Sequence, residues 1–208
     1  MIQNLDPNDF FKTIATVSQS EIKIKGSRFL GFAFPISDKI QAEEILEKHR
    51  KDYYDATHNC FAYTVGFQNE IFRYSDDGEP NGTAGKPIYQ AIKHFDYCNV
   101  LVIVTRYFGG TKLGVGPLAR AYYDAAYQVL SSVPSKIEYF TRKLEIVVDY
   151  SMVNAIKRLL EPISVETNET YTDVVTFTSK ILKSKYDGVI KKIIEISQGK
   201  AKINQTSE

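Results

Sequence analysis

The sequence has no tryptophan and only two cysteines, Cys60 and Cys98, among its 208 residues. Two cysteines cannot form a disulfide framework, so we expect a soluble protein of a reducing, cytoplasmic compartment. No apolar run approaches the ~20 residues needed to cross a bilayer. The longest run, residues 99–105, has the length of a buried strand instead. The first eleven residues are polar and acidic, which is not typical of a signal peptide.

The sequence also lacks a net charge of either sign. Its 26 lysines and arginines almost balance 25 aspartates and glutamates, which leaves +1. A protein of this kind has no global field to attract nucleic acid or an anionic membrane, so any binding cations must gather locally. With 43% hydrophobic and 25% charged residues, the composition is that of a folded globular protein and excludes a disordered chain.

Hydrophobic periodicity predicts an α+β fold with a first domain over residues 1–136. Asp38 with Gln41 three residues later indicates the start of a helix that ends near Lys51. Pro87 suits the first turn of a second helix that ends near Phe95. Strands are expected over residues 12–18, 21–25, 28–36, 58–66, 70–74 and 99–105, and a long helix after residue 117.

The remaining residues, 137–208, predict a second domain after the linker-like stretch Ser131–Ser135. A strand from Lys143 to Asp149 is followed by a helix for which Ser151 is the expected N-cap. Two strands, a second helix that begins near Tyr186 and a short last strand complete the order βαββαβ. This order is typical of the ferredoxin-like fold.

The segment from Thr105 to Arg120 combines a buried strand, a loop with four glycines and a helix. Such a loop lets backbone N–H groups approach an anion at a helix N-terminus, with Arg106, Lys112 and Arg120 as added cations. The same pattern is explained by a tight turn that joins strand to helix. It is not a Walker loop, because Val115 occupies the place of the required lysine.

An acidic loop over residues 75–87 is the second candidate. Asp76, Asp77 and Glu79 lie within four residues of one another, which allows a magnesium site or a general base. Turn formation alone also explains the segment, because Asp-Gly and Pro-Asn-Gly are turn sequences. A thirteen-residue segment without regular structure is uncommon in a compact domain, which favours a ligand or partner surface.

Three smaller features are weaker candidates. His58 and Cys60 share one side of a strand, which fits a nucleophile pair but fits a packed strand face better. Lys25 and Arg28 flank an early turn, where cations are usually solvated. Tyr107 lies beside the glycines, where its ring can stack on a base.

Four motifs in a fixed order are similar to those of the YigZ/IMPACT family, and together they cover roughly residues 10–130. These are residues 25–29 (KGSRF), 58–63 (HNCFAY), 75–87 (SDDGEPNGTAGKP) and 104–114 (VTRYFGGTKLG). Bacterial members of the family also carry a small ferredoxin-like C-terminal domain, which residues 137–208 resemble.

The resemblance implies a fold for each domain. The first is expected to resemble the second domain of small-subunit ribosomal protein five, and the second domain V of elongation factor G. That pairing implies contact with RNA, the ribosome or a translation factor, as an analogy of fold. The resemblance implies no catalytic reaction.

We therefore expect a translation-linked regulatory or RNA-binding protein, without membrane attachment, cofactor or metal, and favour binding over catalysis. The alternative is an enzyme for a phosphorylated small molecule that uses the acidic loop 75–79 and the glycine loop 109–116. A third hypothesis is a protein-interaction module. An exposed apolar patch on the ferredoxin-like sheet would favour this hypothesis. The oligomeric state stays open. The candidate binding residues are Lys25, Arg28, His58, Asp76, Asp77, Glu79, Arg106, Tyr107, Gly109, Gly110, Lys112, Gly114 and Arg120.

Overall fold

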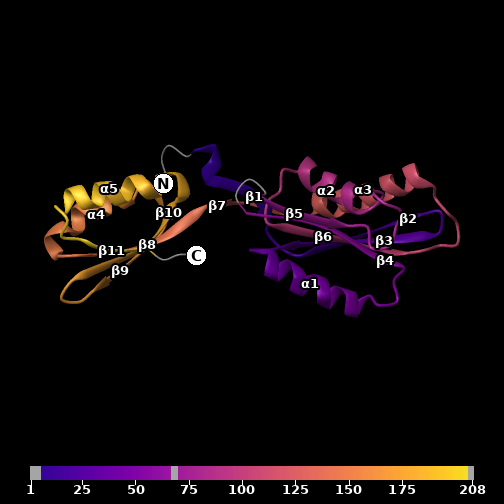
Figure 1. The fold of residues 1–208 in the computed structure, drawn as a ribbon, viewed down its shortest axis with the longest axis horizontal. Coiled ribbons are helices and arrows are strands. Elements are labelled where there is room, and N and C mark those ends of the chain that lie inside the picture. Colours follow the sequence, from indigo (N-terminus) through magenta and orange to yellow (C-terminus); the bar gives the residue numbers. More distant parts are fainter. Residues whose placement is uncertain (1–5, 67–69, 206–208) are drawn as a thin grey trace. The chain divides into compact units, whose positions relative to one another are not determined.

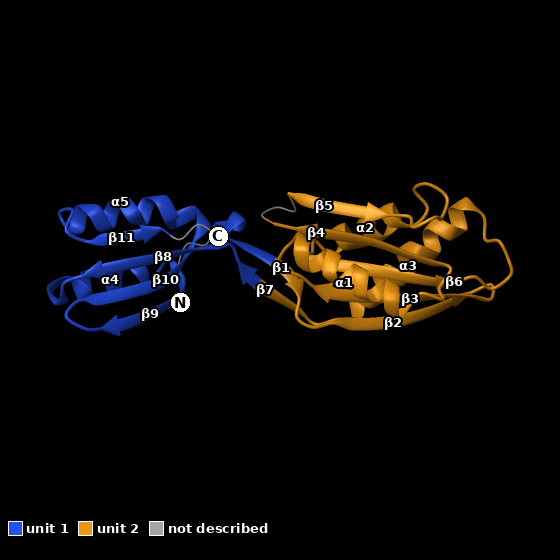
Figure 2. Cartoon of the chain, turned by 60° about the horizontal axis from the view of Figure 1, so that its bottom comes forward, with its two compact units in different colours: residues 1–11, 138–208 blue, residues 12–137 orange. Residues whose placement is uncertain are grey.

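The computed structural model describes residues 6–66 and 70–205. Helices and strands are both abundant, which confirms the predicted α+β fold. The chain divides into two compact units, coloured separately in Figure 2. Residues 12–137 form one unit, and the described parts of residues 1–11 and 138–208 form the other.

The larger unit contains a five-stranded sheet in which every pair of neighbouring strands is antiparallel. Its strands, in spatial order, are β2 (Ser18–Ile24), β3 (Ser27–Pro35), β6 (Val100–Tyr107), β4 (His58–Val65) and β5 (Ile71–Ser75). Helix α1 (Lys39–Asp52) covers one face, while α2 (Gly85–His94) and α3 (Val115–Ser132) cover the other (Figure 1).

Strand alternation sends side chains to two separate cores of this unit. On β3, Phe29 and Ala33 pack against α2 and α3, whereas Phe32 packs against α1. The central strand β6 is buried on both faces, as its unbroken apolar run predicts. The larger core lies on the α2–α3 face, and it is there that the candidate site is assembled.

The smaller unit has the predicted order βαββαβ. Its elements are β8 (Thr141–Val148), α4 (Val153–Leu160), β9 (Ser164–Tyr171), β10 (Val175–Leu182), α5 (Tyr186–Ile196) and β11 (Lys202–Gln205), with the strands in the spatial order β11-β8-β10-β9. Leu144, Ile146 and Phe177 face the two helices in the core. The predicted cap at Ser151 is wrong, because this residue lies inside a short 3-10 helix, Tyr150–Met152, that precedes α4.

The other face of this small sheet is polar. Thr176, Thr178 and Lys180 alternate with the buried residues of β10, and Lys180 pairs with Glu166 of β9 at 2.7 Å. Asn204 of β11 donates to Glu145 of β8. Since hydroxyl, amide and paired charged groups occupy this face in the described residues, it lacks the apolar patch that would favour a protein-interaction module.

The N-terminal segment packs with the smaller unit. Its 3-10 helix, Pro7–Asp9, ends in a fully buried aspartate whose carboxylate accepts from the backbone N–H and hydroxyl of Ser184. A second 3-10 helix, Lys183–Lys185, carries that serine. The segment continues into β1 (Phe10–Ile14), which pairs with β7 (Ser135–Tyr139) as a two-stranded sheet. In the described part of the chain, no helix is long and apolar enough to cross a membrane.

Helix α1 begins as predicted. The carboxylate of Asp38 accepts from the N–H of Gln41, and the Gln41 side chain accepts from the N–H of Ser37. The first contact satisfies a backbone donor that the first helical turn leaves without a partner, and the second fixes the residue before the N-cap.

A buried polar chain ties the C-terminal end of α1 to the sheet. His49 Nε2 lies 2.8 Å from the hydroxyl of Thr105, which lies 2.7 Å from Asn59 Oδ1. Burial lowers the pKa of His49 to about 4, so the ring is neutral at neutral pH. Two rings enclose it, Phe32 at 4.8 Å and Tyr53 at 4.5 Å between centroids.

This burial predicts a pH-dependent stability. Because the folded pKa of His49 lies below the usual 6.5, its stabilisation is complete above pH 6.5 and is lost as the pH falls toward 4. NMR titration of the His49 ring should give a midpoint near 4. The difference in unfolding free energy between the wild type and His49→Gln should shrink by up to about 3 kcal/mol over that range. A difference that is constant with pH would contradict the assignment.

Candidate functional site

Four segments singled out in the sequence meet at one end of the five-stranded sheet. Neighbouring strands run in opposite directions, so the starts of β3 and β4 lie beside the ends of β6 and β5. Arg28 is paired with Tyr107, His58 with Arg106, and Phe61 with Ser75. The antiparallel register therefore brings the early turn, the His58 strand, the acidic loop and the glycine loop together.

A buried ion pair joins two of these segments. Arg106 Nη1 lies 2.6 Å from Glu79 Oε1, and the two side chains are only 6% and 4% exposed. The hydroxyl of Tyr122 on α3 donates to the same carboxylate oxygen at 2.7 Å. The Arg106 guanidinium also lies 5.4 Å from each of the rings of Phe29 and Phe108. Its charge is thus satisfied inside the protein.

This burial corrects the expectation for Arg106. The sequence pattern favoured a guanidinium directed at an external phosphate, but a side chain enclosed by a carboxylate and two rings cannot reach one. Arg106 instead links the strand to the acidic loop and, through a contact of 3.4 Å, to the hydroxyl of Ser27. Its Nε is buried without a hydrogen-bond partner among the described residues.

Asp76 organises the acidic loop around its own carboxylate. One oxygen accepts from the N–H of Gly82, and the other from the N–H groups of Ala84 and Gly85. The last two groups belong to the first turn of α2, whose N-cap residue Ala84 has no capping side chain. Asp76 therefore satisfies backbone donors at the N-terminus of α2, where a carboxylate also interacts favourably with the helix dipole.

Asp77 fastens the same loop to the start of β4. Its backbone has a positive φ of 46°, its side chain accepts from the N–H of Asn59, and its carbonyl lies 2.8 Å from His58 Nδ1. Since a carbonyl only accepts, Nδ1 carries the proton and Nε2 faces Glu79 at 3.8 Å. The three carboxylates of the acidic loop are thus occupied by backbone and side-chain donors.

Cys60 is not activated as a nucleophile. Its thiol donates to the carbonyl of Asp76 at 3.0 Å, and burial raises the pKa of the thiol. Burial also raises the pKa of the neighbouring Tyr122 hydroxyl. Both groups stay protonated at neutral pH, as expected of packed hydrogen-bond donors.

Gly26 and Gly109 bring the early turn into contact with the glycine loop. A Cβ at Gly109 would lie 1.9 Å from the carbonyl carbon of Gly26, so only glycine fits there. The N–H of Gly109 donates to the hydroxyl of Ser27, which is fully buried. Sequence reasoning missed Ser27 and Tyr122 as parts of the site. For Tyr122 the available signal was an inward-facing hydroxyl, which needs a partner.

Beyond Gly109 the loop presents backbone donors without partners. Within the described chain, no hydrogen bond is made by the N–H groups of residues 110–116. Gly110 and Gly114 both have a positive φ of 85°, and a Cβ at either would meet open space. These donors precede the 18-residue helix α3, whose N-terminus adds partial positive charge. The loop has the character of an anion-binding surface.

The exposed cations around this loop fall into two groups. Lys25, Lys112 and Arg120 are exposed and form no ion pair with any residue the structure describes. Arg28 is held by both oxygens of Glu21, at 2.9 and 3.3 Å, and lies over the ring of Tyr107. The first three are free to meet an external anion.

The chain is similar to known proteins over both units. Residues 25–130 match the Impact N-terminal domain, and residues 146–200 match a domain of unknown function, DUF1949. The IMPACT family member YvyE of Bacillus subtilis is 31% identical over 93% of this chain and 89% of its own length. The IMPACT family member YigZ of Escherichia coli is 31% identical over 66% of this chain and 69% of its own.

A solved structure described as a hypothetical protein has a similar fold. It superposes with a TM-score of 0.66 at 26% identity, and the match covers 96% of this chain and 98% of the other. The two-part architecture is therefore shared over nearly the whole length of both proteins.

Because Gly26 and Gly109 are in contact, a glycine-to-alanine substitution should affect stability differently at two positions of the glycine loop. Gly109→Ala should lower the free energy of unfolding by more than about 2 kcal/mol, because the backbone of Gly26 must move. Gly116→Ala adds a Cβ in open space at the start of α3 and should leave stability unchanged or raise it by up to about 1 kcal/mol. Urea unfolding measures both, and equal losses would refute the close approach.

The buried pair predicts strong coupling between Arg106 and Glu79. Arg106→Met leaves a buried carboxylate unpaired and should cost roughly 3–5 kcal/mol, whereas adding Glu79→Gln should recover part of this loss. Arg73 and Glu43 form a matched control with the same 2.6 Å distance but exposed side chains. Their double-mutant cycle should give a coupling below about 1 kcal/mol. Additive losses at Arg106 and Glu79 would contradict the role of the pair.

Proposed function

The chain belongs to the IMPACT family, and from this premise we propose that its larger unit binds the phosphate backbone of RNA in a role linked to translation. The binding surface is the glycine loop, residues 109–116, with the turn that carries Lys25. The link to translation rests on the family's resemblance to ribosomal-protein and elongation-factor folds, which is an analogy.

The observation that carries the proposal is the run of N–H groups over residues 110–116 that have no partner in residues 6–66 and 70–205. Backbone donors at the start of a helix bind phosphate oxygens without sequence preference. Lys25, Lys112 and Arg120 add full positive charges and have no carboxylate partner among the described residues. These local cations supply the attraction that the net charge of +1 does not.

An exposed aromatic ring beside the loop supports RNA over a small phosphate. Phe108 is 45% exposed, although it immediately precedes the glycines and lies over the buried Arg106. A ring in this position can stack on an unpaired base next to the bound phosphates. The proposal therefore favours single-stranded RNA or a loop over a continuous duplex.

Removing the free cations tests this surface. Lys112→Ala combined with Arg120→Ala should weaken binding of a fluorescent single-stranded RNA at least tenfold. Each lost phosphate contact also lowers the salt slope by about 0.7, so the slope of log affinity against log salt should become shallower by about 1.4. Fluorescence anisotropy over a range of salt concentrations measures both effects.

The matched control removes two exposed lysines elsewhere, Lys39→Ala combined with Lys191→Ala. This variant changes the net charge equally and should keep the wild-type affinity and salt slope. Equal losses of RNA affinity in both variants would show that binding depends on net charge and not on the glycine loop. Unchanged affinity in the loop variant would overturn the proposed site.

A further inference from the structure

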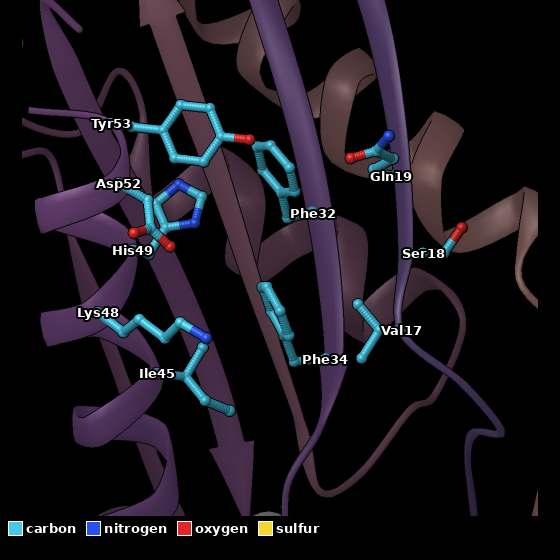
Figure 3. Close-up of a pocket in the computed structure, with 10 residues that line it drawn as sticks. All are labelled: Val17, Ser18, Gln19, Phe32, Phe34, Ile45, Lys48, His49, Asp52 and Tyr53. Carbon is cyan, nitrogen blue, oxygen red and sulfur yellow. The ribbon is translucent and has the colours of Figure 1, made fainter. Parts of the chain in front are cut away.

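A second recess lies on the opposite face of the same sheet. Helix α1 covers β4 and β6 but leaves β2 and part of β3 open, and the space beside it is a hollow of about 450 Å³. This volume lies within the range of small-molecule sites. Figure 3 shows its lining: Ser18 and Gln19 of β2 with the preceding Val17, Phe32 and Phe34 of β3, and side chains of α1 and its C-terminal end.

Aromatic rings form one end of the hollow. The His49 ring stacks on Tyr53 at 4.5 Å with an interplanar angle of 22°, and meets Phe32 edge-on at 4.8 Å. Phe32 and Tyr53 are themselves 5.1 Å apart. Rings arranged in this way favour a flat, polarisable guest over a branched aliphatic one.

The hydrogen-bond chain beneath the hollow fixes the tautomer of His49. The carbonyl of Tyr53 can only accept, so Asn59 must turn its amide nitrogen toward it. Asn59 Oδ1 then accepts the hydroxyl proton of Thr105. Thr105 has no second proton, so His49 Nε2 must donate to it. The lone pair of the imidazole is therefore on Nδ1.

The neutral ring keeps this acceptor available. Burial holds the pKa of His49 near 4. The negative charge of Asp52 acts to raise this pKa, but its effect is smaller than that of burial. Nδ1 makes no hydrogen bond to any residue that the structure describes. An imidazole acceptor that has no protein partner and is accessible from the hollow matches a guest that carries an N–H group.

The remaining polar groups of the hollow suit the edges of such a guest. Gln19 offers both an amide donor and an acceptor, Asp52 a carboxylate, and Lys48 an ammonium group. A metal ion does not fit, because no three His, Cys, Asp or Glu side chains cluster anywhere in residues 6–66 and 70–205. An aliphatic guest would leave all of these polar groups without partners.

We propose that this hollow binds a nucleobase, with the flat ring against Phe32 and Tyr53 and an N–H group of the base donating to His49 Nδ1. A carboxylate and an amide at the same site recognise amino and ring N–H groups on the edge of a base. Free nucleotides and the unstacked bases of RNA share this chemistry.

The inference that the bound base belongs to RNA rests on the proposed function above. A second hollow of about 320 Å³ shares Gln19, Phe32 and Tyr53 with the first and extends to Glu21 and Leu30. Arg28 lies two residues before Leu30, at the start of β3 and next to the turn that touches the glycine loop. Four residues of a β-strand span only ~13 Å. An RNA segment of a few nucleotides can therefore reach both the hollow and the glycine loop.

NMR titrations test the proposal with three probes: free nucleosides, a single-stranded RNA oligonucleotide, and an abasic oligonucleotide with the same phosphates. Nucleosides or the intact oligonucleotide should shift the His49 and Tyr53 resonances, and the abasic strand should not. Gln19→Tyr, which fills the mouth of the hollow, should weaken this binding at least tenfold. Gln90→Tyr, the same change at an exposed position of α2, should not.

The outcomes separate this proposal from the RNA-backbone proposal. Shifts with nucleosides alone assign the hollow to free bases, and shifts with the intact oligonucleotide alone assign it to RNA. If neither probe moves these resonances, the nucleobase site is overturned, even where the Lys112 and Arg120 variant loses RNA affinity. If nucleosides bind while that variant keeps full RNA affinity, the glycine-loop proposal fails and the nucleobase site stands.

Discussion

The contact between Arg106 and Glu79 holds the larger unit's site together. It joins the end of β6 to the acidic loop, and Tyr122 adds α3 through the same carboxylate. Removing two charges from water costs several kcal/mol per ion, which their mutual attraction offsets only when further partners are in place. Here a tyrosine hydroxyl, a serine hydroxyl and two aromatic rings provide them. The pair therefore specifies one arrangement of the loops more than it adds to stability.

That arrangement divides the charged residues of the motifs into two sets. Asp76, Asp77, Glu79 and Arg106 satisfy one another, backbone N–H groups or buried hydroxyls, and so they build the platform. Lys25, Lys112 and Arg120 are left in solvent. Because the charge of Glu79 is paired with Arg106, and Asp76 and Asp77 accept from backbone N–H groups, the acidic loop opposes an approaching anion less than its formal charge suggests. A nearly neutral chain can thus present a locally basic loop.

Periodicity and local signals were sufficient for most of the fold. The start of α1 at Asp38, the buried strand near residues 100–105 and the βαββαβ order all follow from short-range patterns. Ser151 fails as a cap because a 3-10 helix, Tyr150–Met152, occupies the residues directly before α4. The role of Arg106 was also beyond the sequence. Whether a guanidinium faces solvent or a carboxylate 27 positions away depends on the register of strands that are distant in the chain.

The two faces of the five-stranded sheet explain why the sequence motifs point to one surface and not the other. Residues of β6 alternate between them, so Arg106 builds the platform below the glycine loop while its neighbour Thr105 orients His49 on the opposite face. One short segment thus fixes both an exposed donor loop and an aromatic hollow. The glycines of the loop are visible as a motif because backbone geometry demands them. The hollow contains no such motif. The roles of His49, Thr105 and Asn59 follow only from the direction of the hydrogen bonds between them, which the sequence does not reveal.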